Sequence, residues 1–163
     1  MEAFTGKVWV LGDDIDTDII IPTEYLALKT IDDMKQYGFS PLRPELAGQI
    51  EKGDIIVAGK NFGCGSSREQ APEIIKALVI SCFIAKSFAR IFFRNSINNG
   101  LLLIEQPDLH DDIKEGDTIT VKMNEHVDYN GKTYPIAALP ENLMDIIQAG
   151  GLVKAMRKRN GLD

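Results

Sequence analysis

The sequence contains few of the side chains that most often hold metal ions or form disulfides. Its 163 residues include two cysteines, Cys64 and Cys82, and two histidines, His110 and His126. There is no CxxC pair and no cluster of ligands with metal-site spacing. Because an iron–sulfur cluster usually needs about four cysteine thiolates, we expect this chain by itself to hold neither a cluster nor another metal ion.

The sequence also lacks an apolar run long enough to cross a membrane, and its start has no charged segment followed by an apolar one. We therefore expect a cytoplasmic protein that does not bind membranes. The formal net charge of −6 argues against nucleic acid as a partner, because phosphate backbones reward clustered cations. The basic stretch 154–159 is better explained as the solvated last turn of a terminal helix.

Three common functional motifs are missing as well. The stretch Asp13–Asp18 has four acids in six residues, but it lacks the central glycine and the closing glutamate of an EF-hand loop. The P-loop spacing GxxxxGK[ST] is absent, and Arg68 stands where a GxGxxG motif would need its third glycine. No histidine lies close in sequence to a candidate serine nucleophile, so a Ser-His-Asp hydrolase is a poor interpretation.

What the chain does contain is a glycine-rich loop, residues 59–72, between an apolar strand at 54–58 and a run with helical spacing at 73–78. Pro72 lacks an N–H group, so the first helical turn is expected between Arg68 and Pro72. A strand-to-helix connection presents free backbone N–H groups and the positive end of the helix dipole to an anion. We therefore interpret this loop as the active site.

The serine pair in this loop has two interpretations. Ser66 with Glu69, and Ser67 with Gln70, both fit a capping box, and on residue types alone capping is favoured over catalysis. The functional alternative is that backbone N–H groups, one hydroxyl and the planar fork of Arg68 bind a substrate carboxylate. The other serine is then free to abstract a proton, with its oxyanion stabilised by the same groups.

Cys64 and Asp18 are further candidates near the loop. The helix terminus and Arg68 could lower the pKa of the Cys64 thiol and make it reactive. Asp18 comes directly before three isoleucines, so it is the acid of its stretch that we expect to turn inward. Cys82 lies in an apolar run and is expected to be a buried, inert residue.

The hydrophobic pattern predicts an α/β fold. Apolar runs typical of buried strands occur at 8–11, 54–58, 79–85 and 101–104, and helical spacing occurs at 73–78 and 87–99. The second of these helices is expected to carry Phe88, Ile91 and Phe92 on one face and Arg90 and Arg94 on another. The alternation of strand and helix indicates right-handed crossovers and a partly parallel sheet.

The rest of the chain adds surface segments and antiparallel strands. The segment 24–48 is predicted to cross the surface with short helices near 31–37 and 44–47. Asn130-Gly131 indicates a hairpin between strands at 118–121 and 132–136, and Pro135 marks the second as an edge strand. A helix is expected at 141–149, followed by further turns over 152–158. We expect residues 1–163 to form one domain with a mixed sheet, flanking helices and an added hairpin.

Three motifs, in order along the chain, resemble a known family. They are Asp14–Asp18 with Ile21-Pro22, Asn61–Glu69, and Ser87–Asn95 with Asn99–Leu101. Together they are similar to the small subunit of 3-isopropylmalate dehydratase, the free-standing version of the aconitase swivel domain, over about residues 7 to 150. The resemblance implies a swivelling β/β/α domain of the aconitase C-terminal type.

The same resemblance implies roles for individual residues. Ser66 matches the serine that removes the proton beside a carboxylate, and Asp18 matches the aspartate that supports proton delivery to the leaving hydroxyl. Ser67 and Arg68 match residues that bind the substrate carboxylate. The implied reaction dehydrates a 2-substituted malate and rehydrates it with the hydroxyl moved, as in leucine biosynthesis.

The resemblance also implies a partner. In this family a separate large subunit carries a [4Fe–4S] cluster on three cysteines, so a heteromer is expected, and homo-oligomers of the isolated chain stay an open question. The resemblance further implies that the segment after Tyr25-Leu26 selects the substrate side chain, and in this sequence that segment is Ala27-Leu28-Lys29. Two apolar residues favour an isopropyl group, whereas Lys29 departs from the hydrophobic pattern and could meet an anion.

Two kinds of alternative follow. A small subunit of a homoaconitase, or of a methylmalate or dimethylmalate hydro-lyase, would share the motifs and differ in its substrate. A carboxylate- or phosphate-binding module without chemistry would be an alternative of another class.

Overall fold

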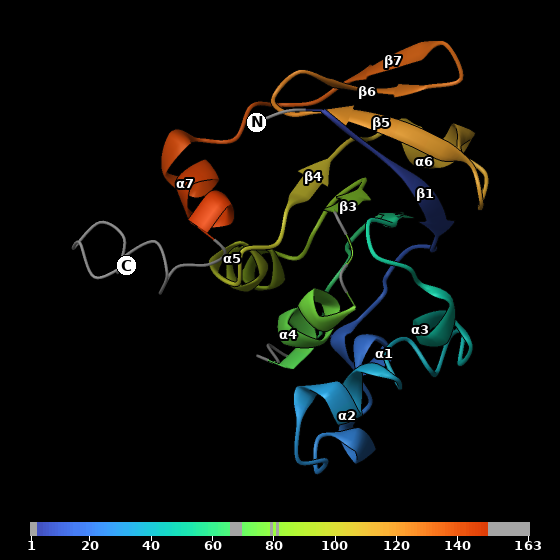
Figure 1. Ribbon diagram of the computed structural model, residues 1–163, viewed down its shortest axis with the longest axis vertical. Coiled ribbons are helices and arrows are strands. Elements are labelled where there is room, and N and C mark those ends of the chain that lie inside the picture. Colours follow the sequence, from blue (N-terminus) through green and yellow to red (C-terminus); the bar gives the residue numbers. More distant parts are fainter. Residues whose placement is uncertain (1–2, 66–69, 79, 81, 150–163) are drawn as a thin grey trace.

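The computed structural model describes residues 3–65, 70–78, 80 and 82–149 of the chain (Figure 1). Seven strands form a sheet in the order β4-β3-β2-β1-β5-β6-β7. The strands are β1 (Phe4–Val10), β2 (Ile55–Ala58), β3 (Cys82–Ala85), β4 (Leu103–Glu105), β5 (Thr118–Lys122), β6 (His126–Tyr129) and β7 (Lys132–Pro135). The helices are α1 (Thr17–Ile20), α2 (Ile31–Lys35), α3 (Leu46–Gln49), α4 (Gln70–Ala77), α5 (Arg90–Asn98), α6 (Leu109–Asp112) and α7 (Glu141–Ala149), with a 3-10 turn η1 (Thr23–Tyr25).

Strands β1 to β4 form the parallel half of the sheet. Val8 of β1 pairs with Ile55 of β2, and Ile84 of β3 pairs with Val57 on one side and Ile104 on the other. Every residue of β2 and β3 is buried, as expected for parallel strands covered on both faces. The predicted α/β class with a partly parallel sheet is therefore confirmed. Within the third predicted strand, 79–85, the described β-strand is β3, from Cys82 to Ala85.

Strands β5 to β7 form the antiparallel half, which pairs with β1 through β5. Asn130 and Gly131 form the tight turn between β6 and β7 with φ angles of 50° and 79°, and β7 is an edge strand, both as predicted. The predicted partner of the hairpin was wrong, because β6 and not the segment 118–121 pairs with β7. Only Val127 of β6 is buried, so this strand has almost no hydrophobic signal.

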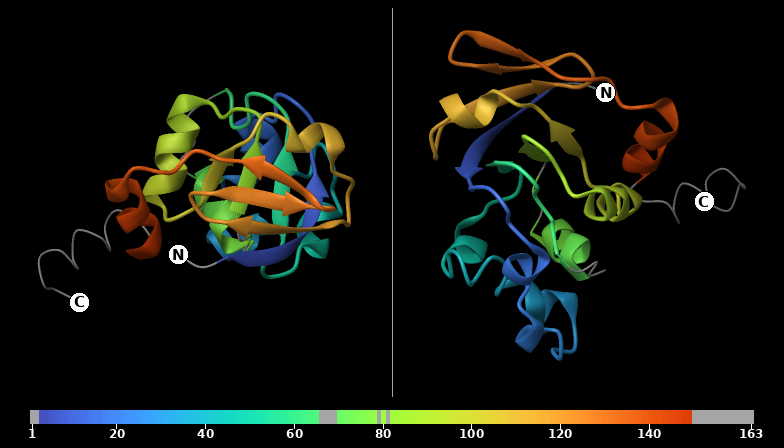
Figure 2. Two further views of the ribbon diagram at one scale, coloured as in Figure 1. Left: turned by 90° about the horizontal axis from the view of Figure 1, so that it is seen from above. Right: turned by 180° about the vertical axis from the view of Figure 1, so that it is seen from behind.

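The helices lie around the parallel strands. Helix α2 packs along α4, while α5 contacts α4, β4 and α7. Seen from above, the antiparallel strands lie across one side of the molecule, with α7 at one end (Figure 2). The short helices predicted near 31–37 and 44–47 are present as α2 and α3, and the predicted helix 141–149 is present as α7, although the residues after Ala149 are not described. The turns predicted over 152–158 lie outside the described residues.

Helix α5 differs from its prediction in start and orientation. It begins at Arg90 with Ala89 as N-cap, because Phe88 instead forms a β-bridge with Phe62. Its buried face consists of Phe92, Ser96 and Ile97. Ile91, which was predicted to share the face of Phe92, is instead 57% exposed.

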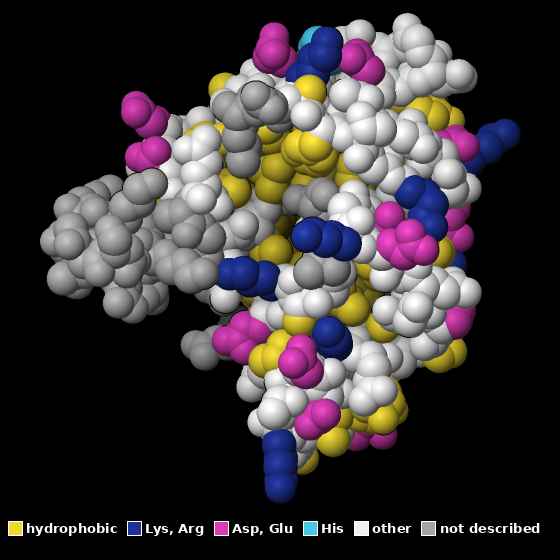
Figure 3. Space-filling view, in the orientation of Figure 1, with side chains coloured by type: hydrophobic (Ala, Val, Ile, Leu, Met, Phe, Trp, Pro, Cys, Tyr) yellow, Lys and Arg dark blue, Asp and Glu magenta, His cyan; other side chains and the backbone are white. Residues whose placement is uncertain are grey.

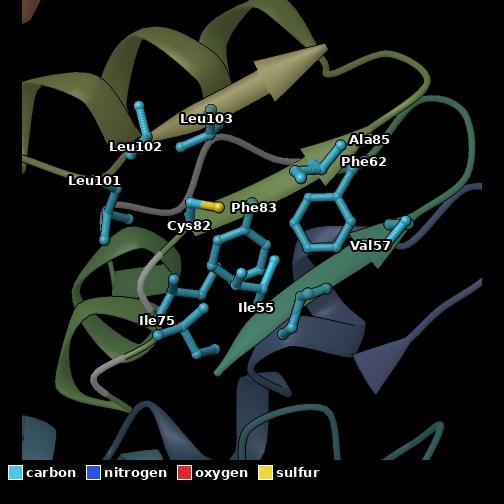
Figure 4. Packing of buried hydrophobic residues seen from close by; sticks show 14 of the residues in the cluster. Ile55, Val57, Phe62, Ile75, Cys82, Phe83, Ala85, Leu101, Leu102 and Leu103 are labelled. Atoms are coloured by element: carbon cyan, nitrogen blue, oxygen red, sulfur yellow. The ribbon is translucent and has the colours of Figure 1, made fainter. Parts of the chain in front are cut away.

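The hydrophobic core includes a group of three aromatic rings beside the parallel strands. Phe62 is fully buried, and its ring centroid lies 5.4 Å from those of Phe83 and Phe92. Figure 4 shows Phe62 and Phe83 packed with Ile55 and Ile75, which come from β2 and α4. Cys82 is buried in the same cluster, and its burial raises the pKa of its thiol, which confirms the expectation of an inert side chain.

The surface has an apolar hollow. Hydrophobic side chains gather around the hollowed middle of the face shown in Figure 3. A cavity of about 160 Å³ lies between α5, β4 and the connection from β7 to α7, lined by Phe93, Leu103, Ile104 and Leu139 among others.

None of the helices in the described part of the chain has the length and apolar character needed to span a bilayer.

Candidate active site

Three connections meet at the edge where the parallel strands β1, β2 and β3 end. They are residues 11–17 after β1, residues 59–65 after β2, which we call the site loop, and residues 86–89 after β3. Parallel strands place their carboxyl ends at the same edge of a sheet, and ligands of such sheets bind outside that edge. All three motifs of the predicted site therefore come together although they are distant in sequence.

The site loop is held to the connection after β1 by backbone hydrogen bonds along its length. The amide of Gly59 donates to the carbonyl of Gly12 (3.0 Å), and the amide of Gly63 donates to Ile15 (2.7 Å). In the other direction, the amide of Asp14 donates to Lys60 (2.8 Å) and that of Thr17 to Cys64 (3.0 Å). The two segments thus form a short parallel pairing, which includes a β-bridge between Asp16 and Cys64.

The connection after β3 holds the site loop from the other side. The Phe62 amide donates to the carbonyl of Ser87 (3.0 Å), and the Ala89 amide donates back to the carbonyl of Phe62 (2.9 Å). The hydroxyl of Ser87 accepts a hydrogen bond from the amide of Asn61 at 2.8 Å. The loop is therefore fixed on both flanks by backbone contacts, which makes its conformation well defined before any ligand binds.

Two residues of this frame have left-handed backbones although neither is glycine. Asp14 has φ 54° and Asn61 has φ 60°, and the side-chain amide Nδ2 of Asn61 donates to the Asp14 carboxylate at 3.2 Å. Asparagine and aspartate tolerate this region best, but each such residue still costs roughly 1–3 kcal/mol. Backbone strain of this kind clusters at functional sites, where surrounding contacts enforce it.

Gly63 allows a helix to pack directly on the site loop. Its φ is 86°, and a Cβ atom at this position would overlap the ring of Phe92 in α5. Gly65 has a similar φ of 90°, but its nearest neighbour to a Cβ atom is 3.4 Å away. The two glycines therefore serve different purposes, since Gly63 permits close packing and Gly65 mainly permits the turn.

The predicted catalytic and carboxylate-binding residues Ser66, Ser67 and Arg68 lie outside the described residues. Gly65, which is exposed, is the last described residue before them, and Gln70 of α4 is the first described residue after them. Gln70 is already helical, so the prediction that the first turn begins between Arg68 and Pro72 stays a prediction. The roles of these three residues stay predictions.

Asp18 does not turn inward as expected. It is exposed in the first turn of α1, whereas Asp16 is half-buried and accepts a hydrogen bond from the amide of Ile19 at 2.9 Å as N-cap. Helix α1 buries Thr17 and Ile20, so the residue between them in the helical turn faces outward. Its position beside the site loop follows from the bridge between Asp16 and Cys64.

Cys64 is half-buried in the site loop. Partial burial, together with the negative charges of Asp16 and Asp14, raises the pKa of its thiol. The lowered pKa that a reactive Cys64 would require is therefore not what the described residues produce. Arg68, which the sequence suggested as a cationic influence, lies outside the described residues. A thiol with a raised pKa is a poor nucleophile near neutral pH.

The predicted specificity segment lies beside the helix that follows the site loop. Leu28 is half-buried and packs against the core, whereas Ala27 and Lys29 are exposed. The rings of Tyr25, at the end of η1, and Tyr37, after α2, stack at 4.0 Å and so bracket the segment together with α2. Because α2 packs along α4, the segment stands on the α4 side of the site.

The contacts that join α6 to the ends of β1 and β3 were not predicted from the sequence. In α6, His110 Nε2 lies 2.7 Å from the carbonyl oxygen of Leu11 at the end of β1, and Asp111 pairs with Lys86 at 2.6 Å after β3. The Asp111 carboxylate raises the pKa of Lys86. A signal for this contact was absent, because His110 and Leu11 are 99 residues apart and neither has an unusual local context.

The described residues offer no metal site of their own. No group of three or more histidine, cysteine, aspartate or glutamate side chains in this part of the chain is placed to hold a metal ion. The acids of the first connection are used in other ways, since Asp13 accepts from the amide of Lys60 at 2.8 Å and Asp16 caps α1.

The sheet topology and the glycine-rich site loop define a swivelling domain of the aconitase type. A family model described as the aconitase C-terminal domain matches residues 21–109, and the chain belongs to this family. The fold predicted from the motifs is confirmed.

Relatives over the whole length narrow this assignment. The 3-isopropylmalate dehydratase small subunit of Lachnospira eligens is 80% identical over 162 residues, which cover 99% of each chain. That of Heliobacterium modesticaldum is 50% identical over 96% of each chain. The crystal structure of 3-isopropylmalate dehydratase from Methanocaldococcus jannaschii matches with a TM-score of 0.91 and 39% identity, covering 98% of this chain and 96% of that one. The resemblance to 3-isopropylmalate dehydratase small subunits is therefore confirmed.

Proposed function

We propose that the chain is the small subunit of a 3-isopropylmalate dehydratase, a hydro-lyase of leucine biosynthesis that works with a large subunit. The observation that carries this proposal is 80% identity, over 99% of both chains, to a small subunit of that name. The site loop, fixed at the carboxyl edge of the parallel strands, supports it independently. The reaction interconverts 2-isopropylmalate and 3-isopropylmalate through dehydration and rehydration.

In the proposed chemistry, this chain removes one proton, supports the delivery of another and binds one substrate carboxylate. Ser66 removes the proton from the carbon beside a carboxylate, while the hydroxyl on the adjacent carbon leaves as water after it receives a proton. Asp18 supports that proton delivery, and Ser67 and Arg68 bind the carboxylate. Water then adds across the double bond with the hydroxyl on the other carbon.

The frame supports these roles. Hydrogen bonds on both flanks fix the site loop as far as Cys64, and Gln70 is already part of α4. Free N–H groups at the start of a helix stabilise both a bound carboxylate and a serine oxyanion. The exposed position of Asp18 suits a group that acts on a substrate held partly by another subunit.

The cluster belongs to the large subunit in this proposal. The whole sequence has two cysteines, one of them buried in the core, so it lacks the thiolates that a cluster needs. When bound on the partner, a [4Fe–4S] cluster would supply a Lewis-acidic iron for the substrate hydroxyl and carboxylate. A cytoplasmic location is part of the same proposal and stays untested.

Reconstitution tests the function directly. The chain is mixed with a large subunit, iron and sulfide, and the absorbance of the unsaturated intermediate is followed after addition of 2-isopropylmalate. We expect turnover only when both subunits are present. A complex that forms, carries its cluster and leaves 2-isopropylmalate unchanged would favour a binding module without chemistry.

A further inference from the structure

Helix α5 connects the site loop to an unusual part of the surface. On its inner side, Phe92 packs on Phe62 and lies against Gly63 of the site loop. On its outer side, Arg90, Ile91 and Arg94 are all exposed. A partner that contacts the outer side of α5 would therefore touch the same helix whose inner side packs on the site loop.

Ile91 is unusual among the apolar residues. It is 57% exposed, and within the described part of the chain only Leu42, at 44%, is another large hydrophobic side chain of comparable exposure. Single exposed apolar residues are common on protein surfaces and need no explanation by themselves. Ile91, however, stands between two arginines on a helix whose N-cap residue is hydrogen-bonded to Phe62 of the site loop at 2.9 Å.

The two arginines carry charge of the sign opposite to the whole molecule. The formal net charge is −6, yet α5 has no acidic residue in its first turn and presents Arg90 and Arg94 to solvent. Across the described residues, neither guanidinium takes part in an ion pair or a hydrogen bond. Arginine is enriched at protein interfaces although other charged residues are depleted at their centres, and an exposed apolar side chain beside it adds contact area that can be buried.

We propose that the outer face of α5, formed by Arg90, Ile91 and Arg94, docks on an acidic, partly apolar surface of the large subunit. This inference rests on the proposed function, because a chain without a cluster completes its site only when a partner reaches the edge where the site loop lies. Helix α5 starts at that edge, so a partner that covers the mouth of the site also reaches the first turns of α5. Ile91 supplies the apolar contact, and the arginines supply orientation and rate of association.

The test uses two matched substitutions of exposed hydrophobic residues. Ile91→Glu places a negative charge in the proposed interface, whereas Leu42→Glu does the same in the segment before α3, on the opposite side of Figure 1 from α5. The partner is the large subunit of the Lachnospira eligens enzyme, whose own small subunit is 80% identical to this chain. The dissociation constant is measured by isothermal titration calorimetry, and circular dichroism shows whether each variant keeps its fold.

We expect Ile91→Glu to raise the dissociation constant by about thirtyfold or more, the effect of a central interface residue, and Leu42→Glu to leave it unchanged. The double variant Arg90→Ala with Arg94→Ala should weaken binding and also reduce its dependence on salt concentration, because fewer charges are then screened. A variant that loses its fold is replaced by Ile91→Ala, for which a smaller increase in the same direction is expected.

The outcomes separate the two proposals. If the wild-type chain binds the large subunit and turns over 2-isopropylmalate, but Ile91→Glu binds as tightly as wild type, the docking surface is wrong and the function stands. If the wild-type chain neither binds nor forms an active complex, both are overturned. If Ile91→Glu instead abolishes a dimer of this chain in sedimentation experiments and leaves the heteromer intact, the face belongs to a homo-oligomer and the proposal fails.

Discussion

At the scale of single residues, Gly63 determines how closely the site loop and α5 can pack. Gly63→Ala combines a left-handed backbone with overlap of the Phe92 ring, whereas Gly65→Ala has the strained backbone alone. We expect Gly65→Ala to lower the free energy of unfolding by about 1–3 kcal/mol. Gly63→Ala should cost about 1–3 kcal/mol more, because the core must also accommodate an extra methyl group. Urea unfolding of both variants measures the difference, and equal costs would mean that Phe92 moves aside without penalty.

Ser66 is the residue whose role matters most for the proposed chemistry. Ser66→Ala should reduce kcat by roughly a hundredfold or more, the usual contribution of a proton-transfer group, while affinity for the large subunit stays unchanged. Arg68→Lys should raise KM instead, because an ammonium group cannot reproduce the bidentate fork. Steady-state kinetics of the reconstituted enzyme check both. Near-normal turnover by Ser66→Ala would return this serine to a capping role.

Which acid turns inward is a residue-scale question that the sequence could not answer. Asp16 and Asp18 are both followed by a β-branched residue within two positions, so their local patterns are similar. The choice depends on where α1 begins, and that point is fixed by the bridge from Asp16 to Cys64 in a distant segment. The raised pKa of Cys64 has a similar origin, since it comes from partial burial and from carboxylates of another connection, neither of which the local sequence shows.

At the scale of elements, the segment between η1 and α2 is proposed to select the substrate. Half-buried Leu28 offers an apolar wall, and each methylene that a substrate buries there is worth about 0.8 kcal/mol. Leu28→Arg replaces this wall with a permanent cation, so preference should move from 2-isopropylmalate toward homocitrate. The ratio of kcat/KM for the two substrates measures the shift, with Lys29→Ala as control. A wild-type preference for homocitrate that Lys29→Ala removes would show that Lys29 reads the substrate.

The connection before α3 is tied to the rest of the molecule by a pair of charges. Arg43 makes a two-point contact with Glu115, whose carboxylate also accepts from the amide of Val10 at 3.2 Å. These hydrogen bonds lower the pKa of Glu115 below its ordinary value of 4.5. A carboxyl group with a lowered pKa stabilises the folded state above its unfolded pKa, and this contribution is lost as the pH falls through its folded pKa.

We therefore expect Glu115→Gln to lower the melting temperature at pH 7, with a difference from wild type that shrinks as the pH falls through the lowered folded pKa of Glu115. The effect should be modest, because the Glu115 side chain is 39% exposed and solvent screens the pair. Glu45→Gln is the control, since Glu45 makes a longer contact of 3.5 Å to the same arginine. A difference that persists unchanged at pH 3 would mean that packing, and not charge, accounts for the loss.

Elements with strong local signals were predicted well, and elements without them were not. The buried runs of β2 and β3, the Asn130-Gly131 turn and the start of α7 all have patterns within a few residues. Strand β6 has one buried residue and gains its regularity from pairing with β5 and β7. The orientation of α5 likewise depends on Phe92 meeting Phe62, a contact between distant segments that no periodicity within α5 encodes.

At the scale of the whole molecule, the isolated chain should be a folded but inactive protein. Its core runs through both halves of the sheet, so it does not need a partner in order to fold. We expect the purified chain to contain no stoichiometric iron or acid-labile sulfide and to show no turnover of 2-isopropylmalate. Chemical analysis of the chain and of the reconstituted enzyme makes the comparison. A stoichiometric cluster in the chain alone would contradict the proposal that the large subunit carries it. That residues 1–163 form one domain stays a prediction.

The central position of β1 has a consequence for biosynthesis. This strand is made first, yet it pairs on one side with β2 and on the other with β5, where Phe4 lies opposite Val121. Contacts between such distant residues form slowly, because the intervening loop must close before the pairing repays it. The antiparallel half can be completed only after most of the chain has left the ribosome. Until then one edge of β1 lacks its partner, and that edge is where a nascent chain of this protein would be most prone to aggregate or to need a chaperone.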